Sequence, residues 1–198
     1  KDLLYIKTQQ RPHLFQLNIP EPQIYHKQVI EIKARMNAKG KIISELSRED
    51  RQKIIDQLPV NRLTPIAVSL IHSYKNPKHE LEIKKLLTEQ GFSFLSISHE
   101  LNPTIHLLPR SETTLANAYL SPIIQQFNDS ISKHIPPNQF YFISSAGQLI
   151  PANEFNAKDS LLSGPAGGIK GAEFLGKKYG IRKLITFDMG GTSTDTAR

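Results

Sequence analysis

The stretch DMGGTSTD, residues 188–195, carries the clearest indication of fold and chemistry in this sequence. It follows an apolar run at 183–187 that is typical of a strand. The glycine pair Gly190-Gly191 permits the positive φ values of a tight hairpin and lets the backbone approach a phosphate group closely. Three further donors follow on the same rim, the hydroxyl groups of Thr192, Ser193 and Thr194.

Acidic side chains flank this turn on both sides. Asp188 stands at the end of an apolar strand, where a carboxylate is costly unless it holds a cation, a water molecule or a donor. A nucleotide site needs this combination, because it uses donors for the phosphate oxygens and carboxylates that hold Mg²⁺ through water. The alternative is a plain Gly-Gly hairpin with a polar rim, and spacing alone leaves both interpretations open.

A second glycine-rich stretch, SGPAGG at 163–168, precedes a helical pattern at 169–178. We expect a loop that enters this helix and offers free amides and a positive dipole end to an anion, through Gly164, Gly167 and Gly168. The alternative is that these glycines only allow a helix and a strand to pack closely.

Composition excludes several classes of protein. The 198 residues contain no cysteine, which rules out disulfides, iron–sulfur clusters and thiolate zinc sites. No apolar run approaches the roughly 18 residues that span a bilayer. Although 25 Lys+Arg against 18 Asp+Glu give a net charge of +7, the basic residues are spread thinly, so we expect no nucleic-acid partner. The histidines His72, His79, His99 and His106 lack metal-ligand spacing, and neither Glu100 nor Glu112 is marked as a catalytic acid or base.

The order of patterns predicts an α/β chain in two parts. A hairpin is expected over 30–46, followed by a helix that Ser47 caps, a strand at 66–71 and a helix that Asn76 caps with Pro77 at its first position. A strand at 92–97 and a long helix at 112–127, kinked at Pro122, complete this part. The linker HIPPN at 134–138 is the candidate domain boundary.

Five stretches, in order along the chain, resemble the hydantoinase/5-oxoprolinase family, which includes ATP-dependent hydantoinase A, N-methylhydantoinase and 5-oxoprolinase. They are RPHLF at 11–15, LIHSYKNPKHE at 70–80, TTLANAYLSP at 113–122, LSGPAGGIKGA at 162–172 and DMGGTSTD at 188–195. The resemblance covers nearly the whole chain. It implies an α/β fold of the RNase-H-like kind, shared with actin, sugar kinases and heat-shock-chaperone ATPases, in which two domains hold ATP between them.

The resemblance also implies an activity. Family enzymes couple ATP hydrolysis to the opening of a cyclic amide, such as a hydantoin or 5-oxoproline, through a phosphorylated intermediate. Asp188 and Asp195 would be catalytic and would hold Mg²⁺ and water, while Gly190, Gly191 and Thr192 would bind phosphate. From the resemblance we also expect a small cyclic amide as substrate, a second hydantoinase subunit or fused domain as partner, and a cytoplasmic location.

Some features depart from the family pattern. The chain has one copy of the Asp-x-Gly-Gly-Thr loop where family members carry two, and Ser145-Ala146-Gly147-Gln148 replaces a common Asn-Gly-Gly turn. We therefore expect an internal fragment without ATPase activity of its own. Residues 1–134 would form the later part of a first RNase-H-like domain with a β-hairpin insertion, and 135–198 a linker and the opening portion of a second.

Two other functions remain open. One is a kinase-like or regulatory module of the same superfamily that binds nucleotide without opening a ring. The other is a basic binding or scaffolding module, which would bind polyanions in a strongly salt-dependent way.

Overall fold

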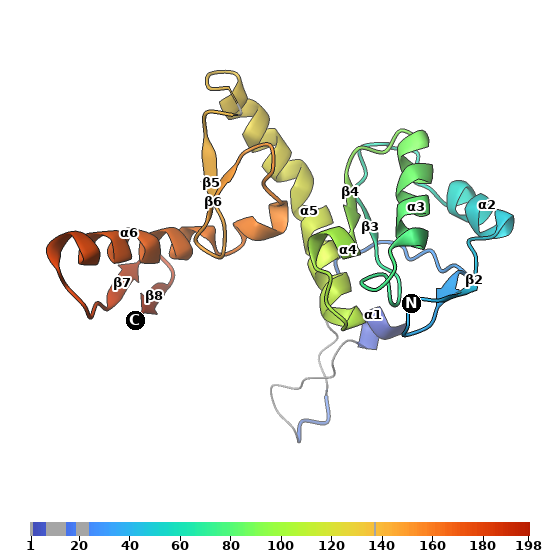
Figure 1. The fold of residues 1–198 in the computed structure, drawn as a ribbon, viewed down its shortest axis with the longest axis horizontal. Coiled ribbons are helices and arrows are strands. Elements are labelled where there is room, and N and C mark those ends of the chain that lie inside the picture. The colour runs from blue at the N-terminus through green and yellow to red at the C-terminus, as the bar shows by residue number, and fades with distance from the viewer. Residues whose placement is uncertain (1, 7–14, 19–23, 137) are drawn as a thin grey trace. The chain divides into compact units, whose positions relative to one another are not determined.

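The computed structural model describes residues 2–6, 15–18, 24–136 and 138–198 (Figure 1). The chain divides into two compact units, Lys1–Pro122 and Ile123–Arg198. Helices and strands alternate in both, so the predicted α/β class is confirmed. The strands described form four two-stranded sheets, β1-β2, β3-β4, β5-β6 and β7-β8. Of the motif at 11–15, residues 11–14 lie outside the described part.

The first unit opens with helix α1 (Asp2–Ile6) and later forms the predicted hairpin. Strands β1 (Arg35–Met36) and β2 (Ile42–Ser44) are antiparallel, with a register irregularity, and are shorter than the predicted pattern. Helix α2 (Arg48–Asp56) begins after Ser47, whose Oγ accepts a hydrogen bond of 3.0 Å from the amide of Asp50. The predicted N-cap is therefore confirmed.

The centre of this unit is a β–α–β crossover. Strands β3 (Ile66–Val68) and β4 (Leu95–Ile97) pair in parallel, and helix α3 (Lys78–Glu89) connects them. Apolar side chains from the sheet and helices close a core that water does not reach, which stabilises the crossover. The buried members of this core are Leu46, Ile54, Val68, Ile83, Leu86, Leu87 and Ile97.

The start of α3 differs by one residue from the prediction. Pro77 is the N-cap and makes no capping bond, because its side chain has no acceptor. Asn76 nevertheless satisfies the first turn, since its Oδ1 accepts a hydrogen bond of 3.1 Å from the amide of Lys78. Past the other end of the helix Gly91 takes φ of +85°, a left-handed conformation that favours glycine.

Two helices follow β4. The predicted loop after this strand begins with a short helix, α4 (Ser98–Leu101). Helix α5 (Leu107–Ser132) is longer than predicted and continues through Pro122. Its residues up to Pro122 belong to the first unit and the remainder to the second.

The second unit contains two hairpins and one long helix. Strands β5 (Tyr141–Ile143) and β6 (Leu149–Pro151) pair antiparallel, and the single-turn helix η1 (Ala157–Ser160) follows. Helix α6 (Ser163–Tyr179) leads to β7 (Thr186–Met189) and β8 (Thr194–Ala197), which also pair antiparallel.

The glycine-rich stretch at 163–168 is helical, so the prediction of a loop entering a helix at 169 is wrong. The amide of Ala166 donates to the carbonyl of Leu162 at 3.1 Å, which closes the first turn of α6. Pro165 fits there because the first amides of a helix have no partner within the helix.

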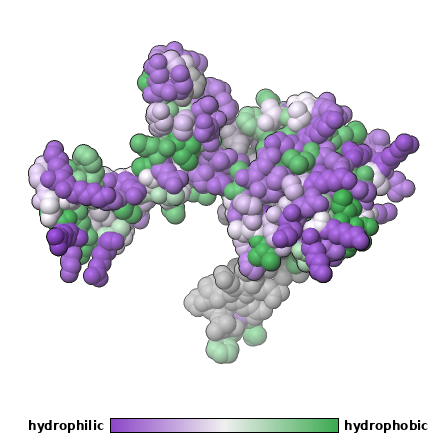
Figure 2. Space-filling view, viewed as in Figure 1, coloured by the Kyte–Doolittle hydropathy of each residue, from purple (hydrophilic) through white to green (hydrophobic). Residues whose placement is uncertain are grey.

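The second unit leaves several large apolar side chains at its surface. Phe174, Phe187 and Met189 are 67%, 69% and 73% exposed. Figure 2 shows hydrophobic surface interspersed with hydrophilic surface over this unit. In the described part of the chain, no helix combines the length and the apolar character that crossing a membrane requires.

Candidate functional site

Strands β7 and β8 bring the two predicted carboxylates together. Asp188 and Asp195 are register partners, and the amide of Gly190 donates to the carbonyl of Ser193 at 2.9 Å to close the turn. Residues directly opposite each other in an antiparallel pair project from the same face. Both aspartates are exposed. The hairpin therefore presents a pair of carboxylates on one face, beside a tight polar turn.

Of the two roles predicted for the glycines of this turn, the structure contradicts one. Neither Gly190 nor Gly191 lies in the left-handed region, so the expectation of positive φ values is wrong. A Cβ atom at Gly190 would lie 3.4 Å from the carbonyl oxygen of Ser193, whereas Gly191 faces open space. What the pair contributes is an uncovered backbone, which a phosphate group can approach closely.

The predicted hydroxyl donors surround the same turn. Thr192, Ser193 and Thr194 are exposed, and their hydroxyl groups form no hydrogen bond with other described residues. They are available to a ligand that accepts hydrogen bonds. No cluster of three or more His, Cys, Asp or Glu side chains suited to a metal ion occurs within the described ranges. A cation at the hairpin would therefore have two carboxylates from this chain and would take its other ligands from elsewhere.

The second predicted group of glycines lies in the first turns of α6. Gly164 and Gly168 have open space where a side chain would be, which leaves that backbone approachable. Gly167 differs, because a Cβ atom there would lie 3.5 Å from the Ile143 side chain of β5. This is an ordinary van der Waals distance, so Gly167 lies against the strand without space as open as that at Gly164 and Gly168. No hydrogen bond links this group to the β7–β8 turn among the residues described.

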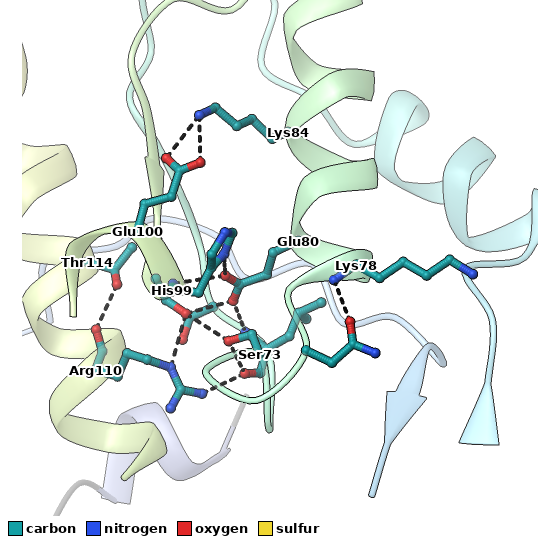
Figure 3. Close-up of polar contacts among 12 residues, drawn as sticks. Ser73, Lys78, Glu80, Lys84, His99, Glu100, Arg110 and Thr114 are labelled. Atoms are coloured by element: carbon teal, nitrogen blue, oxygen red, sulfur yellow. Dashed lines mark hydrogen bonds and ion pairs between the residues drawn. The ribbon is translucent and has the colours of Figure 1, made fainter. Parts of the chain in front are cut away.

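A polar network in the first unit was not predicted from the sequence (Figure 3). Its centre is Glu80, in the first turn of α3, whose side chain is completely buried. Oε1 accepts from the amide of Leu70 at 2.8 Å and from the Ser98 hydroxyl at 2.7 Å. Oε2 accepts from the amide of His99 at 3.1 Å and lies 2.7 Å from Nδ1 of the same residue. The buried carboxylate thus has four partners.

Arg110 of α5 completes the network and is also fully buried. Its Nε donates to Ser98 Oγ at 3.1 Å, and its Nη2 donates to the carbonyl of Leu70 at 2.6 Å. Nη1 donates to the carbonyl of Thr104. Burial lowers the pKa of Arg110 from its ordinary value, while the charge of Glu80 acts in the opposite direction.

The network lies where β3 and β4 end, at the carboxyl edge of a parallel pair. In α/β sheets this edge is where ligands bind. Leu70 follows β3, while Ser98 and His99 follow β4. The sequence contained only a weak indication of this network. Glu80 is the last residue of the motif at 70–80, but a glutamate is also favoured in the first turn of a helix by the helix dipole.

Comparison with known proteins agrees with this fold. The hydantoinase/oxoprolinase family matches residues 110–198, and the N-terminal region of the same family matches residues 1–91. The chain is 34% identical to 5-oxoprolinase 1 of Arabidopsis thaliana over 228 residues, which covers 100% of this chain and 18% of that protein. It is 25% identical over 201 residues to the acetophenone carboxylase gamma subunit of Aromatoleum aromaticum, covering 96% of this chain and 28% of the subunit.

A solved structure is similar over almost the entire chain. The crystal structure of the ATP-dependent caprolactamase from Pseudomonas jessenii matches with a TM-score of 0.82 and 26% identity, over 98% of this chain and 30% of that chain. The chain thus spans less than a third of the length of each of these three relatives. The two family matches cover residues 1–91 and 110–198, which include the β7–β8 hairpin, so the chain belongs to the hydantoinase/oxoprolinase family.

Proposed function

We propose that the protein containing this chain is an ATP-dependent hydrolase that opens a cyclic amide. The observation that carries the proposal is the structural similarity to an ATP-dependent caprolactamase over 98% of the chain. The exposed aspartate pair and its turn lie within the residues that match the family. An amide carbonyl is a poor electrophile and its oxygen is a poor leaving group. Phosphorylation by ATP makes the carbon more electrophilic and turns the oxygen into a better leaving group.

The residues of the β7–β8 hairpin fit a nucleotide phosphate and Mg²⁺. The uncovered backbone at Gly190 and Gly191 and the hydroxyl groups that follow would contact phosphate oxygens. Asp188 and Asp195 would hold Mg²⁺, which proteins bind through one or two carboxylates together with waters and substrate phosphates. Bound there, ATP would supply the phosphoryl group that activates the amide. Gly164 and Gly168 would extend the phosphate-binding surface.

The same proposal includes the finer architecture. We assign the chain to the RNase-H-like fold of the actin and sugar-kinase superfamily, with residues 1–134 in a first domain and 135–198 opening a second. The parallel β3–β4 pair with its crossover helix and the glycine hairpin β7–β8 support this assignment. The proposal also includes a cytoplasmic location. It includes a second subunit or fused domain because one relative is itself named as a subunit.

Substrate-stimulated phosphate release by the full-length protein tests the function. We expect release to rise with one of 5-oxoproline, hydantoin or ε-caprolactam, together with the ring-opened product. Asp188→Asn should abolish both signals. The matched control is Asp129→Asn, which removes the same charge from an exposed position on α5 and should leave both unchanged. ATP binding without stimulation by any cyclic amide would contradict ring opening and favour a regulatory or kinase-like module.

A further inference from the structure

We infer that Glu80 and His99 form a proton-accepting pair, in which Nε2 of His99 takes a proton from a water molecule at the carboxyl ends of β3 and β4. The inference rests on the proposed function, since the water is the one that attacks the cyclic amide. It concerns residues that lie outside the β7–β8 hairpin and that the family resemblance does not single out as catalytic.

The hydrogen bonds of Glu80 determine which nitrogen of His99 carries hydrogen. A carboxylate only accepts hydrogen bonds, and Glu80 Oε2 lies 2.7 Å from His99 Nδ1. Nδ1 must therefore be the donor, which leaves the lone pair of a neutral imidazole on Nε2. Ser98 also donates to the Glu80 carboxylate. Its Oγ accepts a hydrogen bond from Arg110 Nε and donates its own hydrogen to Glu80 Oε1.

Accessibility distinguishes His99 from the other buried histidines. Its side chain is 15% exposed, whereas that of Glu80 is 0% exposed. Nε2 of His99 makes no hydrogen bond with other described residues and is not among the buried atoms that lack a partner. By contrast, His72 Nδ1 and His79 Nε2 are buried atoms without a hydrogen bond, and His79 Nε2 lies 3.6 Å from Glu45 Oε2. Of these three histidines, only His99 combines a carboxylate at Nδ1 with an accessible second nitrogen, Nε2.

Charged groups surround His99. The buried carboxylate of Glu80 lies directly against the ring, with Oε2 at 2.7 Å from Nδ1. Arg110 is linked to that carboxylate through the intervening Ser98 hydroxyl. Glu100, on the same short helix as His99, is neutralised by Lys84 of α3 at 2.7 Å and adds little net charge. The pairing resembles the carboxylate–histidine arrangement of enzymes in which a buried acid orients an imidazole base.

The proposed steps balance in atoms and electrons. The water oxygen forms a bond with the carbon of the phosphorylated amide, one O–H bond breaks and its proton moves to Nε2, and the π electron pair of the C=N bond moves onto the ring nitrogen. The resulting imidazolium is stabilised by Glu80. When the ring C–N bond breaks, its electron pair stays on nitrogen, which takes the proton from Nε2, while the new hydroxyl group loses its proton to solvent as the C=O bond forms. The carbon keeps the phosphate as an acyl phosphate, which a second water converts to the carboxylate and inorganic phosphate. His99 returns to its neutral form.

The variant His99→Asn separates this role from a structural one. Asparagine keeps a donor where Nδ1 stands and can still satisfy Glu80, but it has no counterpart of Nε2. In the full-length protein we expect kcat for ring opening to fall about 10²–10⁴-fold, the usual contribution of general base catalysis, with KM little changed. The acidic limb of the pH dependence of kcat/KM should disappear, while Tm stays near that of the wild type. His106→Asn, an exposed histidine of the same unit, is the control.

Two results would overturn the inference: a wild-type rate and pH profile in His99→Asn, or hydrogen on Nε2 rather than Nδ1 in neutral His99. The second is measured by ¹⁵N NMR of the imidazole nitrogens in wild-type protein, which requires neither turnover nor a variant that folds. If the wild-type protein opens no cyclic amide, the proposed function fails, and the NMR measurement still decides whether Nε2 is the free acceptor.

Discussion

The Glu80 carboxylate and the Arg110 guanidinium, both completely buried, are joined by a single hydroxyl group, that of Ser98. Ser98 Oγ accepts from Arg110 Nε at 3.1 Å and donates to Glu80 Oε1 at 2.7 Å. Opposite charges taken out of water are stable only when their hydrogen bonds are fully satisfied. This hydroxyl therefore links three segments: the start of α3, the end of β4 and α5.

Ser98→Ala is expected to destabilise the first unit. The substitution leaves the buried Nε of Arg110 without its partner and removes one of the two hydrogen bonds to Glu80 Oε1, which costs about 1–3 kcal/mol. Thermal and urea unfolding should both show the loss. The control Ser93→Ala removes a hydroxyl from an exposed position just before β4 and should change the free energy of unfolding by less than about 0.5 kcal/mol. Equal stability of the two variants would mean that the network contributes nothing.

Two glycines of α6 should respond in opposite directions to alanine. At Gly176 a Cβ atom would lie 2.5 Å from Leu184 Cδ1 and 3.2 Å from the carbonyl oxygen of Ile181, so Gly176→Ala should cost about 1–3 kcal/mol. At Gly171 nothing lies within 4 Å, and alanine should gain about 0.5–1 kcal/mol through its higher helix propensity. Unfolding monitored in the second unit measures both. A gain at Gly176 would refute the close approach.

Glu173 should titrate at unusually low pH. Its carboxylate lies 2.6 Å from Lys177 Nζ and 2.9 Å from Lys170 Nζ on α6. These two partners, Lys177 first, lower its pKa from 4.5 to about 2. A carboxyl group with a depressed pKa stabilises the folded state fully above its ordinary pKa of 4.5, and this contribution is lost as the pH falls toward 2.

Carboxyl ¹³C NMR measures the pKa of Glu173 directly. High salt should move it back toward 4.5, because the group is solvent-exposed and its ion pairs are screened. Glu173→Gln should remove the pH dependence of α6 stability in this range. A titration midpoint near 4.5 at low salt would contradict the ion pairs.

The aspartate pair should destabilise the hairpin when no cation is present. Like charges directly opposite each other on a β ladder repel, so Asp188→Asn or Asp195→Asn should stabilise the β7–β8 hairpin by roughly 0.2–1 kcal/mol in the absence of Mg²⁺. Amide hydrogen exchange in β7 and β8 is the measurement. Addition of Mg²⁺ with ATP should protect the wild-type hairpin and leave the variants unprotected. Protection of both variants would place the cation elsewhere.

Local sequence signals predicted the ends and turns of elements well. The Ser47 cap and the hairpin around Gly190-Gly191 each depend on residues only a few positions apart. Such signals act through backbone preferences and short-range hydrogen bonds, which a sequence displays directly. The same logic failed at 163–168, where the glycines predicted a loop and the first turns of α6 formed instead.

Residue patterns alone were sufficient to predict the α/β class, the glycine hairpin with an aspartate on each side, and the family resemblance. They did not predict that Glu80 contacts Leu70, Ser98 and His99, or that Arg110 donates to the carbonyl of Leu70, 40 residues away. The reason is physical: a charged side chain leaves water only where distant segments together satisfy all its hydrogen bonds. That condition depends on how the chain packs, and no local pattern of residues expresses it.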